Sequence, residues 1–222
     1  MTTDIARTLL VIPMKDPKDA KTRLGSGLDQ RERGDLALSL FGILVQRIQT
    51  VLAARAKAQG IANAIDLAVV SASPTLKAAA ERLAIRHIPE GPTRGLSAAL
   101  QHAADEAHAL GYGSLCILPG DLADPKPADL SRLIDHAVAG QTAVICPSSD
   151  WGTNALLLPL PNPIHFQFGE KSFHNHYRAM ADAGLTPILL PLTSLRFDVD
   201  RLDDLRHLSR DHWHLLAKGD GR

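Results

Sequence analysis

Short apolar segments alternate with longer helical patterns along most of the chain, and this alternation constrains the fold more than any other feature. Residues 8–12 and 66–70 have the length and apolar character of buried strands, and a helical pattern from about residue 31 to 58 separates them. Further strands are expected at 85–88, 115–118 and 143–146, with helices beginning near residues 74, 96 and 127. This rhythm is typical of βαβ units. It predicts an α/β fold with a mostly parallel central sheet flanked by helices.

The rhythm changes after Pro147. Residues 156–158 and 165–168 are two extended pieces separated by a proline-rich loop, and Ser172 then begins a helix that runs to about residue 183. We therefore expect residues 148–184 to form a small extended insertion that acts as an acceptor pocket or lid. A chain of 222 residues is long enough for one well-buried domain, so a single domain spanning residues 1–222 is expected.

Composition limits the partners and the compartment. The 24 basic residues balance the 24 acidic ones, so no overall field attracts nucleic acid or an anionic membrane surface. No apolar run approaches the ~20 residues that span a bilayer. Cys116 and Cys146 fall in predicted buried strands and no leader segment is apparent, which indicates a reduced, cytoplasmic protein with a small-molecule partner. A homodimer stays open, because pattern alone cannot separate an exposed apolar stripe from the core.

Three aspartates are candidates for a metal site. Asp198 and Asp200 alternate along an expected extended segment, so their side chains should face one side and Val199 the other. Asp121 follows the apolar strand at 115–118, which places it at a strand's carboxyl end, where open α/β sheets bind ligands. Mg²⁺ suits three such carboxylates, because it takes oxygen ligands and is completed by water and substrate phosphates.

A basic loop follows the first expected strand. It contains Lys15, Lys18, Lys21 and Arg23. Loops in this position hold phosphates in many α/β nucleotide-binding proteins. Neither a Gly-x-x-x-x-Gly-Lys-Ser/Thr loop nor a Gly-x-Gly-x-x-Gly fingerprint is present, and the alternative is a solvated basic loop. The acidic site downstream favours phosphate binding.

Residues near the helix expected to begin at Ser172 have both structural and binding interpretations. Ser172 could cap the helix, or it could join Gly169 in an anion site at the helix amino terminus. Thr153 follows Gly152 and could belong to a turn, to a strand entry or to a binding site. His174 and His176 lie two residues apart on this helix, so they would face different directions and make a poor zinc pair.

Several segments resemble one known family, and they span nearly the whole chain. They are Ala20–Leu24, Gly95–Leu100, Pro119–Leu122, Gly152–Leu157, Phe168–Phe173 and Asp198–Leu205. In this order they are similar to the 2-phospho-L-lactate guanylyltransferases, whose members use 2-phospho-L-lactate, phosphoenolpyruvate or 3-phospho-D-glycerate. The Gly-Thr-Asn-Ala-Leu and Phe-Gly-x-x-Ser-Phe segments carry most of the specificity.

The resemblance implies a nucleotidyltransferase fold, related to the nucleotide-diphospho-sugar transferases and Rossmann-like, that works in deazaflavin coenzyme synthesis. GTP would be the donor, a small phosphorylated acid the acceptor and Mg²⁺ the cofactor. The implied metal ligands are Asp121, Asp198 and Asp200. The implied acceptor-binding residues are Thr153, Gly169 and Ser172. The implied nucleotide-binding residues are Lys21, Arg23, Gly95, Leu96 and Ser97, and the basic loop adds Lys15 to them. Lys21 and Arg23 would act in catalysis together with Asp121.

Two departures from the family pattern affect the expected pockets. Ser97 stands where many relatives have asparagine, and the stretch 148–151 is shorter than usual. Trp151 is therefore expected to reshape the acceptor or base pocket. Two other functions remain open at this stage: a nucleotide-sugar-dependent glycosyltransferase of related fold, and a non-catalytic sensor of a phosphorylated metabolite.

Overall fold

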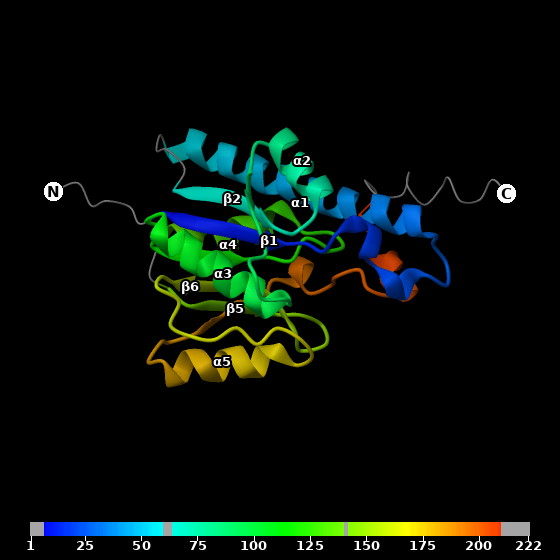
Figure 1. The fold of residues 1–222 in the computed structure, drawn as a ribbon. Coiled ribbons are helices and arrows are strands. Elements are labelled where there is room, and N and C mark those ends of the chain that lie inside the picture. The colour runs from blue at the N-terminus through cyan, green and yellow to red at the C-terminus, as the bar shows by residue number, and fades with distance from the viewer. Residues whose placement is uncertain (1–6, 60–63, 140–141, 210–222) are drawn as a thin grey trace.

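A seven-stranded sheet lies between two layers of helices in the computed structural model of the protein (Figure 1), which describes residues 7–59, 64–139 and 142–209. The strands are β1 (Thr8–Pro13), β2 (Ile65–Val70), β3 (Arg86–Ile88), β4 (Ser114–Ile117), β5 (Val144–Pro147), β6 (Thr153–Pro159) and β7 (Ile188–Leu189). Their order across the sheet is β3-β2-β1-β4-β6-β5-β7. β6 runs antiparallel to β4 and β5, and the other neighbouring pairs are parallel. The predicted mostly parallel sheet is confirmed.

Helices cover both faces of this sheet. They are α1 (Gln30–Gln59), α2 (Pro74–Arg82), α3 (Leu96–Ala109), α4 (Pro127–Ala139) and α5 (Ser172–Asp182). Short 3₁₀ helices are η1 (Pro17–Asp19), η2 (Thr22–Leu24), η3 (Thr193–Leu195) and η4 (Leu202–His207). In β1, Leu10 and Ile12 pack with α1, α2 and α4, whereas Leu9 and Val11 pack with α3 and α5. The period-two alternation of a strand thus divides the core between the two faces.

The segment expected to form an insertion is divided in the structure. β6 lies inside the sheet between β4 and β5, so the first part of 148–184 is a central strand. Residues 165–168 form no strand, although Phe166 is buried against the α3 and α5 side of the sheet. Beyond this segment, Ile188 and Leu189 form the short edge strand β7. A lid or acceptor-pocket role for the rest of the segment stays a prediction.

α1 is long and apolar enough, by length and composition alone, to cross a membrane. That finding corrects the expectation that no segment passes such a test. Leu40, Leu44 and Ile48 of this helix are each about 1% exposed or less and belong to the protein core. Arg47, one helical turn after Leu44, donates a hydrogen bond to Asp124. This pattern is typical of a core helix in a globular domain.

The two cysteines lie in strands, as expected. Cys116 in β4 and Cys146 in β5 are both buried and free. Burial raises the pKa of the Cys116 thiol to about 12 and that of Cys146 to about 11. Both groups therefore behave as small apolar side chains rather than as nucleophiles.

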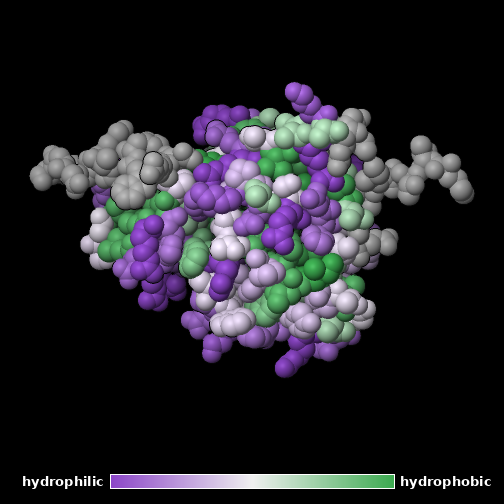
Figure 2. All heavy atoms as spheres, turned by 180° about the vertical axis from the view of Figure 1, so that it is seen from behind, coloured by the Kyte–Doolittle hydropathy of each residue, from purple (hydrophilic) through white to green (hydrophobic). Residues whose placement is uncertain are grey.

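The surface mixes polar and apolar side chains. On the rear face, hydrophobic side chains gather in several groups that hydrophilic ones separate (Figure 2). Ile188 and Leu189 of the edge strand β7 are 37% and 50% exposed. A two-residue apolar edge is too short to define a partner surface, so formation of a homodimer stays a prediction.

Candidate active site

A cavity of about 360 Å³ lies at the carboxyl ends of the four parallel strands β3, β2, β1 and β4. Each strand contributes a residue to its wall, at or just beyond its last position: Glu90, Val70, Pro13 and Pro119. This is the edge at which open α/β sheets bind ligands. The volume falls in the range of small-molecule sites.

Three carboxylates meet at one side of this cavity. Oxygen atoms of Asp121, Asp198 and Asp200 lie within 4.8 Å of one another, as the sequence predicted. Backbone pairing brings the two segments together, because the Val199 N–H donates to the Asp121 carbonyl at 3.0 Å. Val199 is fully buried in a small apolar cluster with Leu24, so its side chain points away from the neighbouring carboxylates. The expected alternation is confirmed.

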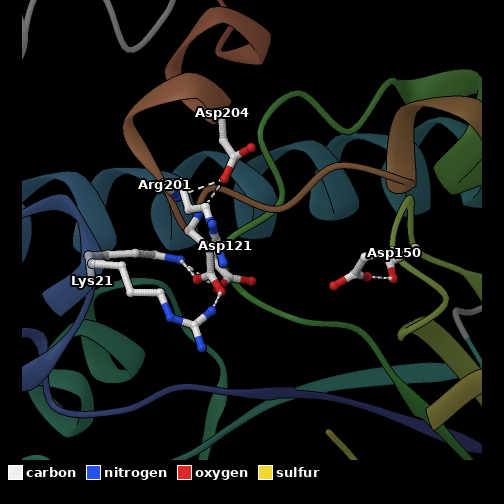
Figure 3. A network of polar contacts seen from close by, with 8 residues as sticks. Lys21, Asp121, Asp150, Arg201 and Asp204 are labelled. Carbon is white, nitrogen blue, oxygen red and sulfur yellow. Dashed lines mark hydrogen bonds and ion pairs between the residues drawn. The ribbon is translucent and has the colours of Figure 1, made fainter. Parts of the chain in front are cut away.

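Two cations of the basic loop reach this cluster. The Lys21 Nζ atom lies 2.6 Å from Asp121 Oδ2 (Figure 3). It also lies 3.5 Å from Asp200 Oδ1. Its side chain is only 6% exposed, and its backbone has a left-handed φ of 55°. Arg23 is exposed and donates from Nη1 to Asp200 Oδ2 at 3.1 Å. The basic loop is therefore folded onto the acidic site rather than solvated as a whole.

The cluster has more negative charge than its cations neutralise. Burial, followed by repulsion from Asp121 and Asp200, raises the pKa of Asp198 to about 6. Burial also opposes the charge on Lys21, but attraction to Asp121 and Asp200 outweighs it and raises the pKa of the ammonium group. Three oxygen donors with unneutralised charge, beside a cavity, are suited to a hard divalent cation.

Asp204 supports the cluster from behind. Its Oδ2 atom accepts backbone hydrogen bonds from Asp200 at 2.9 Å and from Arg201 at 2.7 Å (Figure 3). These bonds fix the turn that leads from Asp200 into η4. Asp204 belongs to the segment Asp198–Leu205 that resembles the family, but the sequence predicted no role for it.

A second polar group lies where β6 meets α5. Thr153 Oγ1 lies 3.0 Å from Ser172 Oγ and 3.0 Å from His176 Nδ1. Thr153 is the first residue of β6 and not part of a turn, and Ser172 is the first residue of α5 after Lys171. Since Lys171 is the N-cap residue, the alternative in which Ser172 caps the helix is wrong, and the Ser172 hydroxyl pairs with Thr153 instead.

His176 organises this second group, and the sequence reasoning missed it. The side chain is fully buried, and burial lowers its pKa to about 4. The Gln167 N–H donates to His176 Nε2 at 3.0 Å, so in the neutral ring Nδ1 carries the proton and donates to Thr153. The i,i+4 spacing from Ser172, which places both residues on one helix face, was the available signal. His174 is exposed, so the two histidines do face different directions.

The expected nucleotide-binding residues are divided between the cavity and this second group. Lys15, Gly95 and Leu96 line the cavity, and Leu96 is 45% exposed at its mouth. The Ser97 hydroxyl instead accepts a hydrogen bond from the Phe168 N–H at 3.0 Å. Ser97 follows Leu96, which lines the cavity, and its hydroxyl contacts Phe168, the residue before Gly169. It therefore connects the cavity to the second group.

Gly169 leaves open space at the second group. Its φ is 144°, a value that side-chain-bearing residues rarely adopt, and a Cβ at this position would meet nothing within 4 Å. Thr153, Gly169 and Ser172 are not among the described residues that line the cavity. The sequence-predicted residues thus form two neighbouring groups, one acidic and basic, the other rich in hydroxyls.

The shortened loop before β6 has a strained conformation. Trp151 has a left-handed φ of 67°, is 54% exposed, and stacks on His174 with ring centroids 5.3 Å apart. Asp150 accepts a hydrogen bond from the Ser148 hydroxyl and lies apart from the carboxylate cluster (Figure 3). An effect of Trp151 on the acceptor or base pocket stays a prediction.

Comparison with known proteins connects this geometry to a family. Residues 8–209 match the family described as guanylyl transferase CofC like. A phosphoenolpyruvate guanylyltransferase from Rubrobacter xylanophilus is 35% identical over 199 residues, covering 89% of this chain and 91% of that protein. A 3-phospho-D-glycerate guanylyltransferase from Colwellia psychrerythraea is 32% identical over 203 residues, covering 91% of each.

The fold also has solved counterparts. A crystal structure from Desulfovibrio desulfuricans, assigned as a nucleotide-diphospho-sugar transferase, superimposes with a TM-score of 0.70 at 18% identity, covering 97% of this chain and 96% of that one. At this identity the likeness concerns the fold alone, and it confirms the expected nucleotidyltransferase architecture. Since the family match spans the sheet, both helical layers and the carboxylate cluster, the chain belongs to the CofC-like guanylyltransferase family.

Proposed function

We propose that this protein transfers the guanylyl group of GTP onto the phosphate of a small phosphorylated acid and releases diphosphate. The observation that carries this proposal is the cluster of Asp121, Asp198 and Asp200 beside a cavity of nucleotide size, with Lys21 at its centre. Such a cluster serves a reaction in which phosphates must be held together against their mutual repulsion.

The three aspartates would hold Mg²⁺. Their donor set fits this ion, because all three ligands are carboxylate oxygens and their negative charge exceeds the positive charge of Lys21 and Arg23. When bound, the ion would neutralise phosphate charge and align the reacting groups. Asp204 would keep Asp200 in place through the two backbone bonds that it accepts.

The remaining residues would act directly on the substrates. An oxygen of the acceptor phosphate forms a bond to the α-phosphorus of GTP, and the bond from that phosphorus to the diphosphate oxygen breaks. No general base is required, since a phosphate monoester with a second pKa near ~6 is mostly dianionic at neutral pH. Lys21 and Arg23 would stabilise the departing diphosphate, while Lys15, Gly95, Leu96 and Ser97 would line the nucleotide.

The second polar group, which contains the hydroxyls of Thr153 and Ser172, would bind the acceptor. His176 donates to Thr153, so the hydroxyl protons of Thr153 and Ser172 are left to donate to each other and to an anion. Gly169 leaves room beside the amino terminus of α5, where the helix dipole favours negative charge. This arrangement suits the phosphate and carboxylate of 2-phospho-L-lactate, phosphoenolpyruvate or 3-phospho-D-glycerate better than a sugar hydroxyl.

The proposed reaction belongs to deazaflavin coenzyme synthesis in the cytoplasm. The family and the names of its relatives favour guanylyl transfer over glycosyl transfer. A non-catalytic sensor would bind the same ligands without releasing diphosphate. Turnover therefore separates the sensor from the enzyme.

The test is diphosphate release by the purified protein with Mg²⁺, offering GTP, ATP, CTP and UTP against each of the three acids. We expect GTP-dependent release with one preferred acid. Asp198→Ala and Asp200→Ala should abolish release while the circular dichroism spectrum is unchanged. Unimpaired release in both variants would contradict the metal assignment, and no release by the wild type with any pair would contradict the transferase.

A further inference from the structure

One acidic residue of the cavity has no part in the carboxylate cluster. Among the described residues that line the cavity, the carboxylates are Asp121, Asp200 and Glu90. The two aspartates pair with Lys21, whereas no hydrogen bond or ion pair joins Glu90 to any described residue. A half-buried carboxylate without a donor retains unused acceptor capacity that a ligand can fill.

The surroundings of Glu90 suit a flat apolar ring. Val70, Leu96 and Ala99 line the same cavity. Leu96 is 45% exposed, which leaves a large apolar side chain free to cover a bound ring. A base that stacks against these side chains would present its hydrogen-bonding edge to a nearby polar group.

The loop that carries Glu90 is held firmly enough to discriminate between ligands. The Ser71 N–H donates to the Ile88 carbonyl at 3.1 Å, which ties the end of β3 to β2. Gly91 follows with a left-handed φ of 81°, and a Cβ there would lie 2.9 Å from the His102 ring on α3. The chain on both sides of Glu90 is thus packed against its neighbours.

The position of Glu90 along the sheet edge indicates that it contacts the base of a bound nucleotide rather than the ribose. Glu90 follows β3 and Asp121 follows β4, with β2 and β1 between them. Three strand spacings of about 4.8 Å place the two strand ends about 14 Å apart. A nucleotide with its α-phosphate at the aspartates would reach Glu90 with the far edge of its base, because the ribose lies closer to the phosphate.

We propose that Glu90 selects guanine by accepting hydrogen bonds from its N1–H and N2 amino groups. Guanine offers these two donors side by side, and a carboxylate accepts both. Adenine has an unprotonated N1 at this place, which would face the carboxylate as a second acceptor. The inference rests on the proposed use of GTP and assigns the residue that enforces it.

The experiment measures binding of GTP, ITP, ATP and 2′-deoxyGTP with Mg²⁺ by calorimetric titration, without an acceptor. Wild-type protein should prefer GTP over ITP, which lacks the N2 amino group, and over ATP. Glu90→Gln should weaken GTP binding on the order of tenfold to a hundredfold, because a bond to a charged acceptor is lost. The GTP/ITP and GTP/ATP affinity ratios should fall accordingly, and the GTP/2′-deoxyGTP ratio should not change.

Glu81→Gln is the matched control. Glu81 is exposed on α2, so this substitution makes the same chemical change outside the cavity. It should leave all four affinities unchanged. The proposal is overturned if Glu90→Gln keeps the wild-type GTP/ITP ratio, or if the GTP/2′-deoxyGTP ratio changes instead, which would place Glu90 at the ribose. Failure of the proposed function shows differently, as GTP binding with no diphosphate release for any acceptor.

Discussion

At the scale of single residues, the site is defined by charges that its own side chains do not balance. Asp198 illustrates this, because burial and two neighbouring carboxylates raise its pKa to about 6. An unfolded chain would give an aspartate pKa of about 3.9. The folded protein therefore holds a proton on Asp198 at pH values where the unfolded chain has lost it.

The consequence is a pH-dependent gain in stability for Asp198→Asn. Between pH about 4 and 6 the folded state binds more protons, so this group lowers the free energy of unfolding as pH rises, by at most roughly 1.4 kcal/mol per pH unit. The asparagine variant lacks this penalty. Urea unfolding without metal should show its advantage over wild type growing by about 1 kcal/mol between pH 5 and pH 7. An equal advantage at both pH values would contradict the raised pKa of Asp198.

His176 gives a second prediction at this scale. His176→Phe fills the buried space but removes the donor to Thr153, so the hydroxyl protons are no longer oriented. We expect the KM for the acid to rise about tenfold, as for one lost hydrogen bond to an anion, with the KM for GTP unchanged. Steady-state kinetics with each substrate varied in turn measures both.

Two further variants separate positioning from general damage. His174→Phe changes an exposed residue of the same helix and should leave both KM values at the wild-type level. His176→Asn restores a donor near Nδ1 and should recover part of the acceptor affinity. A parallel rise in both KM values for His176→Phe would indicate a structural defect instead.

At the scale of elements, the loop after β4 makes a close approach to the loop after β1. A Cβ on Gly120 would lie 2.3 Å from Met14 Sδ and 2.9 Å from Ile12 Cγ2. Glycine at this position therefore lets the segment that carries Asp121 pass against β1. The cluster depends on that contact as much as on its carboxylates.

Gly120→Ala should destabilise the protein by about 1–3 kcal/mol, the usual range for overpacking in a core. Gly42→Ala is the matched control, because Gly42 lies inside α1 and its added Cβ meets nothing within 4 Å. That change should stabilise the protein by about 0.5–1 kcal/mol through helix propensity. Chemical unfolding of both variants measures the difference, and equal effects would show that Met14 moves aside without penalty.

At the scale of the whole molecule, the site joins segments far apart in the chain. Lys21 follows β1, Asp121 follows β4, and Asp198 and Asp200 follow η3. A ligand that binds this cluster contacts segments from the amino-terminal and the carboxyl-terminal parts of the chain. Because it binds only the folded protein, it stabilises the native state by mass action.

Mg²⁺ with GTP should therefore raise the melting temperature. At a nucleotide concentration about 100 times the dissociation constant, the gain is about 2.7 kcal/mol, or roughly 5–10 °C for a domain of this size. Chelation of the metal should remove most of the shift, as should Asp200→Ala. Asp35→Ala, an exposed change on α1, should keep the full shift. A shift that survives chelation would show that the nucleotide binds without metal.

The sequence by itself determined the parts of this protein that depend on local patterns. Alternating short apolar and longer helical segments determine a mostly parallel α/β sheet, because period-two and period-3.6 patterns bury different faces. The alternation in Asp198-Val199-Asp200 predicted two carboxylates on one side, and the position of Asp121 after a buried strand predicted the third.

Tertiary structure alone decided what depends on neighbours in space. β6 lies in the middle of the sheet because its apolar residues 155–158 can be buried on both faces there. The prolines that follow this segment gave no indication of a central strand. His176 became a donor to Thr153 only through burial and the Gln167 amide. Glu90 joined the cavity because four parallel strands end at one edge. Contacts between residues distant in sequence carry no periodic signal, so only the folded chain specifies them.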